Sequence, residues 1–237
     1  MKSFQIIGLV IIALMLSTCF LNKPWLIQVV VLHDVTDQQL SKPEASSILK
    51  FYSFDGNNKW NEAIFNYVQL SDISLNRIQT IHLPQETSWF SNELEREKNI
   101  KGFQNQVTDI LNNSLLDTSS KAQSSVYLAL VHALNSLSGN EAWDRVLLVY
   151  SDLMENNSDL SFYSEKKLNE LIRNPDSVQM KFEEWAPLPK IKGVEVHLIY
   201  QPTNTITDKN FRIVSAFYKQ LLENKGAKVF IEANTQK

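Results

Sequence analysis

Cysteine is nearly absent from this sequence, which has one, Cys19, in 237 residues. A single cysteine excludes an internal disulfide framework and a zinc site built from several cysteines. The four histidines show no His-x-x-x-His or His/Cys spacing that would support zinc. Glycine is also scarce, at six residues, and neither common glycine-rich phosphate loop is present. The usual sequence signals for nucleotide binding and for structural zinc are therefore missing.

Basic charge is not in excess, because 23 Lys and Arg face 26 Asp and Glu, for a net charge of -3. Because the chain has no excess of basic residues to attract phosphates, we expect no nucleic-acid partner. Hydrophobic residues make up 43% and charged residues 21%, which are ordinary values for a globular protein. The length suffices for one domain with a well-buried core, and no repeat or linker divides residues 26–237. We expect one domain over residues 22–237, preceded by a separate segment, residues 1–21.

A long apolar run, "FQIIGLVIIALMLSTCF", covers Phe4–Phe20 and follows Lys2. Such a run is a targeting segment and is kept out of fold reasoning. Its end, "LSTC", resembles a bacterial lipobox, in which the cysteine, here Cys19, is lipidated, although Thr18 is an unusual residue before it. An uncleaved membrane anchor is a second interpretation, since about 17 to 25 apolar residues span a bilayer. A cleaved signal peptide is the third. All three place the domain outside the cytoplasm, at a bacterial cell envelope, and the first two hold it to the membrane.

Apolar, β-prone segments alternate with amphipathic segments along the rest of the chain. Continuous runs such as "WLIQVVVLH", "DRVLLVYSD" and "GVEVHLIY" are typical of parallel strands buried on both faces. Helical patterns cover residues 91–116, 124–139, 164–174 and 208–226, and Pro175 is expected to end the third. The alternation predicts an α/β fold, with a doubly wound, mostly parallel central sheet flanked by helices.

Two of the predicted strands deliver an aspartate at their carboxyl ends. The first ends in Asp34 and the second in Asp152, and the helix between them in sequence begins with hydroxyl residues. Ligands of open α/β sheets sit outside the carboxyl ends of the strands. Oxygen ligands alone suit a hard cation, above all Mg²⁺. The pattern therefore predicts a magnesium site at this edge of the sheet.

In the order of its strands and helices, and in the residues at the ends of these elements, the sequence resembles a von Willebrand factor type A domain. That family's metal-ion-dependent adhesion site reads Asp-x-Ser-x-Ser after the first strand, a threonine before a central helix and an aspartate after the fourth strand. Here the first motif is "DVTDQ", residues 34–38, Ser124 takes the threonine position, and the last motif is "SD", ending in Asp152. A narrower likeness, through "SDLMENNSDLSFY", is to an uncharacterised bacterial envelope subgroup with Asp-x-Thr-Asp after the first strand.

The resemblance implies a site for Mg²⁺, or for Mn²⁺ or Ca²⁺, and a role in protein binding without catalysis. In that family the open coordination position of the cation takes a carboxylate from a partner protein. Gln38 departs from the family's serine because its amide side chain is longer, and Thr118 and Ser125 are alternative sources of the hydroxyl assigned to Ser124. The ligands carried over by position are Asp34, Thr36, Gln38, Ser124 and Asp152.

Two other interpretations of the same residues stay open. Asp34 and Ser124 are also ordinary turn and helix-capping residues, in which case the domain is a metal-independent scaffold with a dead site. A phosphotransferase of the haloacid-dehalogenase type would use Asp34 as a nucleophile and Asp152 to hold Mg²⁺. Most such enzymes need a second acidic residue where Thr36 stands and an adjacent acidic pair that "SDLMEN" lacks. We therefore expect no enzymatic activity.

Overall fold

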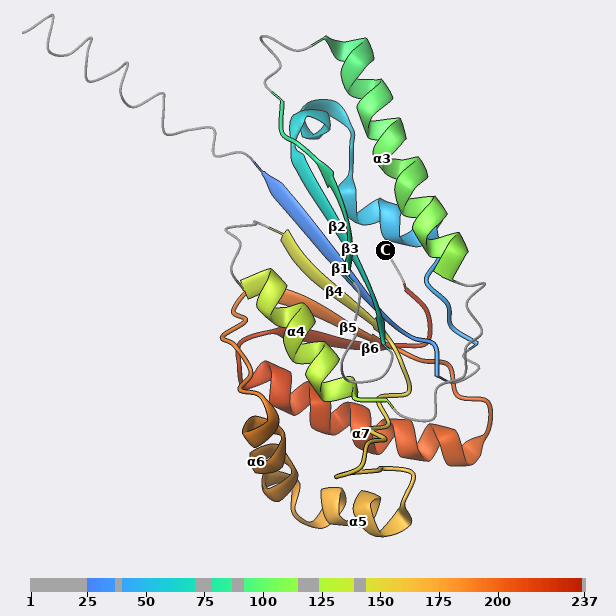
Figure 1. Cartoon of the computed structure of the whole chain (residues 1–237), viewed down its shortest axis with the longest axis vertical. Helices are drawn as coiled ribbons and strands as arrows, with labels where there is room; N and C mark the ends of the chain where they lie inside the picture. Colours follow the sequence, from blue (N-terminus) through green and yellow to red (C-terminus); the bar gives the residue numbers. More distant parts are fainter. Residues whose placement is uncertain are drawn as a thin grey trace, which may run out of the picture.

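A single sheet runs through the middle of the molecule (Figure 1). The computed structural model describes residues 25–36, 40–70, 78–86, 92–114, 124–138 and 144–235, and in these ranges six strands are ordered β3-β2-β1-β4-β5-β6. All neighbouring strands are parallel except β2 and β3. The strands are β1 (Leu26–Asp34), β2 (Glu62–Leu70), β3 (Ile78–Leu83), β4 (Asp144–Tyr150), β5 (Val194–Ile199) and β6 (Lys228–Glu232).

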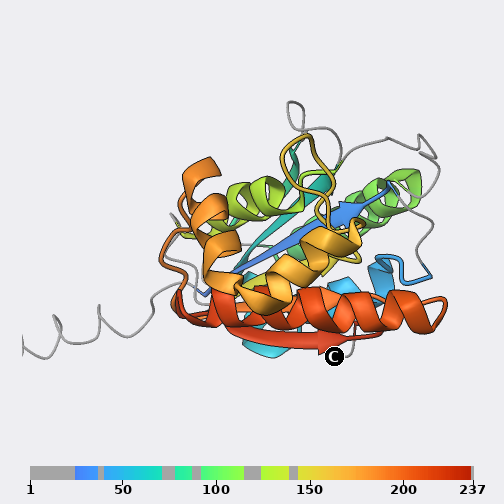
Figure 2. The same cartoon turned by 90° about the horizontal axis from the view of Figure 1, so that it is seen from below.

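Helices cover both faces of this sheet, as the sequence predicts. Helices α4 to α7 pack on one face, and α2, η1 and α3 pack on the other (Figure 1). Figure 2 shows α7 lying alongside β6. The helices are α2 (Ala45–Ile48), η1 (Leu49–Tyr52), η2 (Gly56–Trp60), α3 (Glu93–Ser114), α4 (Val126–Ser138), α5 (Glu165–Arg173), α6 (Pro175–Trp185) and α7 (Thr205–Glu223). The α/β fold class is confirmed.

Strand β1 shows why the sequence has continuous apolar runs. Val30 and Leu32 point into the core beneath α4 and α7, whereas Val29 and Val31 point into the core beneath α3, and all four are fully buried. Successive residues of a strand face opposite sides, so a strand covered by helices on both sides needs an apolar residue at every position.

The start of α3 is held by a buried arginine. Arg96 is 0% exposed, and its guanidinium donates to the backbone oxygens of Lys59 at 2.5 Å, Asn61 at 2.6 Å and Pro84 at 2.7 Å. It also lies 3.4 Å from the Glu86 carboxylate. A guanidinium offers five N–H donors in a fixed fork, which allows one side chain to bind several carbonyls. Arg96 therefore ties α3 to the beginning of β2 and the segment after β3.

The structure confirms that a helix ends before Pro175 and shows a further helix that the sequence analysis does not predict. Helix α5 does end before Pro175, at Arg173, but Pro175 is also the first residue of a further helix, α6, which continues to Trp185. The side chain of Asn174 accepts a hydrogen bond from the Ser177 amide at 3.3 Å and caps this helix. Proline suits the first helical position, where no intrahelical N–H bond is lost. The proline therefore separates two helices.

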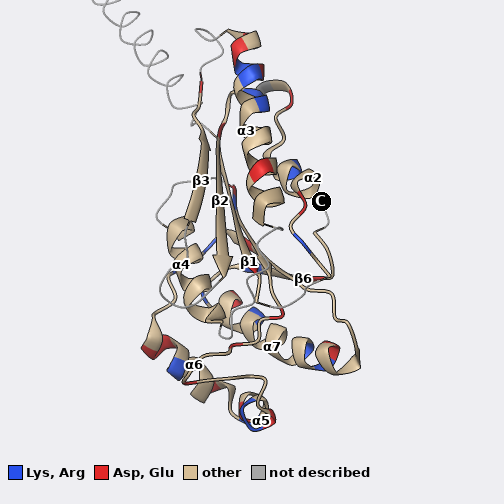
Figure 3. Ribbon diagram, turned by 45° about the vertical axis from the view of Figure 1, so that its right-hand side comes forward, with Lys and Arg blue, Asp and Glu red and all other residues tan. Residues whose placement is uncertain are grey.

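The carboxyl ends of β1 and β4 lie side by side at the centre of the sheet. From β1 the chain continues to β2 on one side, while β4, β5 and β6 extend on the other, so this is a topological switch point. Lys and Arg are interspersed with Asp and Glu along the helices around the sheet (Figure 3). The fold thus brings the segments that follow β1 and β4 to one place, where the sequence predicts a cation site.

The predicted N-terminal segment falls outside the part of the chain that the structure describes. The apolar run Phe4–Phe20 and Cys19 belong to it, so lipidation of Cys19 and membrane anchoring stay predictions. Among the described residues, no helix is both long and apolar enough to cross a membrane.

Candidate functional site

Asp34 is the last residue of β1, and its carboxylate is held by groups from two strands. The side chain is buried, and Oδ2 accepts a hydrogen bond from Ser151 Oγ, which follows β4, at 2.9 Å. Oδ1 accepts from the Thr36 amide at 3.0 Å and from Thr36 Oγ1 at 2.6 Å. A short polar side chain that binds the backbone two residues ahead forms a tight turn. Asp34 and Thr36, two predicted ligands, are therefore in direct contact.

The chain turns sharply directly after β4. Leu153 has a φ of 63°, which is rare for a residue other than glycine, and its side chain is fully buried. Its amide donates to Ser151 Oγ at 2.9 Å. A backbone in this region costs on the order of 1–3 kcal/mol and persists where the surrounding contacts hold it. The buried Leu153 side chain and the Ser151 hydroxyl supply those contacts here.

Asp152 is also bound by protein donors. Oδ1 accepts from the Met154 amide at 2.9 Å, and Oδ2 accepts from the Tyr163 hydroxyl at 2.9 Å. Asp152 is 8% exposed, whereas Tyr163, which donates to it, is 53% exposed. Asp152 therefore lies at this edge of the sheet, next to Ser151, and is hydrogen-bonded to an exposed tyrosine.

Ser124 stands immediately before α4 and pairs with the segment that follows β4. The Ser124 amide donates to the Asn156 oxygen, and the Asn156 amide donates to the Ser124 oxygen, both at 2.9 Å. Ser124 Oγ lies 3.4 Å from the Met154 oxygen. This backbone pairing brings the start of α4 to the Ser151–Asn156 segment. Gln38 and the alternative Thr118 lie outside the described residues.

Sequence reasoning missed Glu155, a fully buried side chain of this region that accepts several hydrogen bonds. It is 0% exposed, and it accepts hydrogen bonds from Ser125 Oγ at 2.9 Å, the Tyr127 amide at 3.0 Å and Asn157 Nδ2 at 2.9 Å. The Tyr218 hydroxyl of α7 adds a longer contact at 3.4 Å. Burial raises the pKa of the Glu155 carboxyl to about 7, although these hydrogen bonds oppose the rise.

Glu155 accounts for the hydroxyl residue that the sequence offered as an alternative to Ser124. The Ser125 hydroxyl is directed to Glu155 Oε1, and the amide of Tyr127, in the first turn of α4, is directed to Oε2. A carboxylate at a helix N-terminus satisfies amides that lack intrahelical partners. The one signal in the sequence was an acidic residue directly after the apolar pair Leu153-Met154, and apart from Asn157 the partners named above are 28 to 63 positions away.

The side-chain atoms at this edge that could ligate a metal suit a hard cation more than a soft one. The side chains of Asp34, Thr36, Ser124 and Asp152 offer only carboxylate and hydroxyl oxygens, which Mg²⁺, Mn²⁺ and Ca²⁺ prefer. In the ranges that the structure describes, no three His, Cys, Asp or Glu side chains are grouped so that they could hold a metal. Among the described residues, a cation here would therefore depend on hydroxyl oxygens in addition to the two aspartates.

On the other face of the sheet, the same edge carries a buried histidine. His33 is 5% exposed, and its Nδ1 lies 2.9 Å from the Tyr67 hydroxyl. Burial, with a smaller contribution from Lys42, lowers the pKa of His33 to about 4, so the ring is neutral near pH 7. Lys42 and Tyr150 help to line a cavity of about 300 Å³ beside it. His33 is thus a hydrogen-bonded core residue.

Comparisons with known proteins add little to this description. No protein-family model matches the chain, and no curated protein matches it. Among solved structures, the chain is similar to an aerotolerance-related membrane protein from Bacteroides fragilis that carries multiple mutations to serine. The likeness has 12% sequence identity and a TM-score of 0.36, and covers 89% of this chain and 92% of that one. At these values the properties of that protein have no bearing on this chain.

Proposed function

We propose that this protein is an interaction module of a bacterial cell envelope, held there by its N-terminal segment, which binds a partner protein at the carboxyl edge of its sheet. We further propose that Mg²⁺, or Mn²⁺ or Ca²⁺, binds at this edge through Asp34, Thr36, Gln38, Ser124 and Asp152. Such an ion keeps net positive charge and favours an anionic oxygen, such as an acidic side chain of the partner.

One observation carries the proposal: the hydrogen bond between Asp34 and Ser151 at the switch point. It joins the two motifs that the sequence singles out, "DVTDQ" and "SD", across adjacent strands. Asp152 is the next residue, and the Ser124 backbone pairs with Asn156 in the same segment. Oxygen donors from three separate parts of the chain therefore belong to one edge, which is where open α/β sheets bind ligands.

The same edge carries exposed apolar side chains. Leu40 follows β1 and is 58% exposed, Tyr163 follows β4 and is 53% exposed, and Ile206 follows β5 and is 73% exposed. Because the carboxyl ends of parallel strands meet at one edge, these three residues belong to the same side of the molecule. Exposed apolar groups around polar ones are a common composition for a protein-binding surface. These exposed apolar side chains support the proposal that a partner protein binds at this edge, in addition to a cation.

The experiment is a thermal unfolding series on the full-length chain in detergent micelles, with Mg²⁺ or Mn²⁺ added. A cation that binds the folded state must raise its stability by mass action, and a hundredfold excess over Kd is worth about 2.7 kcal/mol. We expect a rise in Tm for the wild-type chain and none for Asp34→Asn. Asp144→Asn is the matched control, because Asp144 is an aspartate at the opposite end of β4, and it should respond as the wild type does.

A metal-independent scaffold is the second candidate, and a specific observation favours it. The two aspartates together accept at least five hydrogen bonds from the protein itself, among them three at Asp34 and two at Asp152. Carboxylates satisfied in this way need no cation to stay buried. If millimolar Mg²⁺ and Mn²⁺ leave the Tm of the wild-type chain unchanged, the cation proposal is wrong and this second function stands.

A further inference from the structure

The described part of the chain begins very close to the apolar run that the proposed function places in the membrane. Phe20 ends that run, and Trp25 follows five positions later. An extended chain spans at most about 3.6 Å per residue, so Trp25 stays within about 20 Å of the membrane, whether the anchor is the run itself or a lipid on Cys19. Strand β1 starts at the next residue, Leu26, so the anchor holds the amino end of the sheet.

Trp25 is fixed at this end of the sheet with part of its ring exposed. Its indole Nε1 donates to Asp144 Oδ2, at the start of β4, at 3.1 Å, and its backbone oxygen accepts from the Glu62 amide, at the start of β2, at 3.2 Å. The residue is nevertheless 43% exposed. Tryptophan is enriched at membrane–water interfaces because its ring has an apolar body and a polar N–H. A partly exposed tryptophan this close to an anchor therefore suits the headgroup region.

Helix α3 begins at the same end of the molecule and adds a further apolar side chain (Figure 1). Leu94, in its first turn, is 75% exposed. Arg96 binds the oxygen of Asn61, directly before β2, and so fixes the start of α3 beside the start of that strand. The preceding residue, Trp60, is partly exposed, and Lys59 Nζ lies 5.4 Å from the centre of its ring.

The charged side chains at this end decide which headgroups it suits. Glu93 and Glu95 flank Leu94 in the sequence and are exposed. The ammonium of Lys59 is already paired with the Glu93 carboxylate. Exposed carboxylates are repelled by an anionic bilayer, whereas a zwitterionic headgroup offers them no net charge. The apolar and aromatic side chains, and not an attraction to anionic lipid, would therefore carry a contact with the membrane.

We propose that the amino end of the sheet rests on the bilayer, with Trp25, Trp60 and Leu94 against zwitterionic phospholipid headgroups. The inference rests on the membrane anchoring in the proposed function but not on the cation. It also gives the direction of the proposed binding edge. Strand β1 has nine residues, and at about 3.3 Å per residue it extends about 30 Å from its amino end to Asp34. The carboxyl edge therefore faces away from the bilayer, where a partner protein reaches it without competing with lipid.

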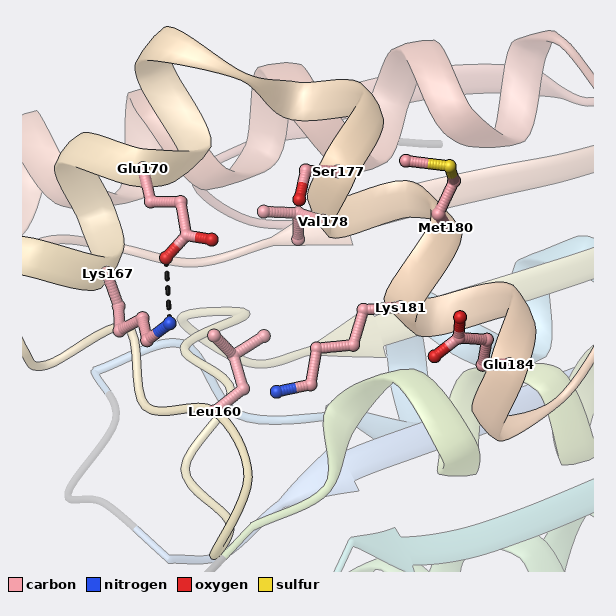
Figure 4. A pocket seen from close by; sticks show the side chains of 8 residues that line it. All are labelled: Leu160, Lys167, Glu170, Ser177, Val178, Met180, Lys181 and Glu184. Carbon is pink, nitrogen blue, oxygen red and sulfur yellow. Dashed lines mark hydrogen bonds and ion pairs between the residues drawn. The ribbon is translucent and has the colours of Figure 1, made fainter.

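Exposed apolar side chains at the other end of the molecule provide a comparison. Met180 of α6 is 60% exposed and lies beside a cavity of about 290 Å³ between α5 and α6 (Figure 4). Helices α5 and α6 are far from the start of α3 in two views (Figures 1 and 3). A bilayer that touches one of these ends does not touch the other.

The test uses the full-length chain in phosphatidylcholine vesicles in which some headgroups carry a nitroxide. A nitrobenzoxadiazole label is attached to one introduced cysteine at a time, and the nitroxide quenches its fluorescence only at close range. We expect the label at Leu94→Cys to be quenched severalfold more than the label at Met180→Cys or at Ile206→Cys, on the carboxyl edge. The wild-type chain treated with the same reagent measures the background from Cys19.

Second substitutions in the Leu94→Cys chain test what carries the contact. Trp25→Ser should reduce the quenching severalfold, because it removes the apolar ring. Trp25→Phe should retain most of it, because phenylalanine keeps a ring and lacks only the N–H that Asp144 binds. Met180→Ser is the matched control and should leave the quenching unchanged. Replacing part of the phosphatidylcholine by phosphatidylglycerol should weaken the quenching, because Glu93 and Glu95 repel anionic headgroups.

Vesicle flotation separates failure of this inference from failure of the proposed anchoring. If the chain does not float with the vesicles, the anchoring is wrong and this inference is wrong with it. If the chain floats but the three labels are quenched equally, or the label at Met180→Cys is quenched most, the anchoring stands and this inference is overturned. It is also overturned if Trp25→Ser and Met180→Ser reduce the quenching equally, or if quenching at Leu94→Cys requires phosphatidylglycerol.

Discussion

The Ser151 hydroxyl donates to Asp34 Oδ2 at 2.9 Å, although the two residues lie 117 positions apart in the sequence. This hydrogen bond joins the ends of two neighbouring strands. The same hydroxyl oxygen accepts the amide of Leu153, the residue with positive φ. One serine therefore links the first predicted motif to the sharp turn that sets the position of Asp152.

Ser151→Ala should destabilise the domain. The change removes one donor from a buried carboxylate and the acceptor of the Leu153 amide, and unsatisfied buried groups cost about 1–3 kcal/mol each. Chemical denaturation should show a loss of about 2 kcal/mol or more in the free energy of unfolding. Ser158→Ala, at an exposed serine a few residues further along, should stay within about 0.5 kcal/mol of the wild type. If both variants lose the same free energy of unfolding, the hydrogen bonds of Ser151 do not stabilise the domain more than those of an exposed serine.

The pH dependence of stability should contain two opposing contributions. Glu155 has its pKa raised from 4.5 to about 7 in the folded state, so the stability it contributes is complete below pH 4.5 and is lost as the pH rises to about 7. His33 has its pKa lowered from 6.5 to about 4, so its contribution is complete above pH 6.5 and is lost as the pH falls to about 4. Each contribution is worth about 3 kcal/mol, since one pKa unit corresponds to 1.36 kcal/mol.

Single variants should separate these two contributions. In Glu155→Gln the histidine remains, so the free energy of unfolding should rise with pH between about 4 and 6.5, relative to the wild type. In His33→Gln the carboxyl remains, so stability should fall between about pH 4.5 and 7. Urea denaturation at half-unit pH steps measures both slopes. Parallel curves for the wild type and Glu155→Gln would show that Glu155 does not titrate in this window.

Tyr163→Phe tests whether the tyrosine competes with a cation for Asp152. Its hydroxyl donates to Asp152 Oδ2, one of the oxygens that a bound cation or its water would need. Removing a hydrogen bond worth about 0.5–1.5 kcal/mol should raise the affinity for Mg²⁺ at least about twofold, measured by calorimetric titration of the full-length chain. Asp152→Asn should lower it. Unchanged affinity in Tyr163→Phe would mean that the tyrosine does not compete.

Arg96→Lys should cost more than its conservative appearance suggests. A lysine cannot reproduce the fork that binds the oxygens of Lys59, Asn61 and Pro84, and these acceptors lose their donors. We expect a loss of about 3 kcal/mol or more in the free energy of unfolding, measured by urea denaturation. Arg173→Lys, at an exposed arginine at the end of α5, should have almost no effect and serves as the control.

The absence of phosphotransferase activity is a direct prediction. Asp34 is 2% exposed and its carboxylate accepts three hydrogen bonds, whereas a nucleophile must reach the phosphorus atom of its substrate. With p-nitrophenyl phosphate and Mg²⁺, the wild-type chain should release no more product than Asp34→Asn. Hydrolysis that disappears in Asp34→Asn would establish the haloacid-dehalogenase-type interpretation.

Local patterns in the sequence predict much of this fold. Strands β1, β4 and β5 are recognisable because a strand covered on both faces is apolar at every position. Asp34 and Asp152 could be assigned to one edge, because parallel strands share a carboxyl edge. The end of α5 before Pro175 is recognisable in the same way, whereas α6 is not, because a proline that ends one helix is equally suited to begin the next.

By itself the sequence determined the α/β class, the succession of the main strands along the chain and the aspartates at the ends of two of them, because each depends on residues close together in the chain. Only the tertiary structure decided which groups those tips contact. Asp34 binds Ser151, Asp152 binds Tyr163, and Glu155 gathers α4 and α7 around a buried carboxyl. Such pairings depend on strand order and on the path of the loops, which no local pattern encodes. The burial of Arg96 could not be predicted for the same reason. It lies among charged residues in the sequence, but in the fold it is fully buried.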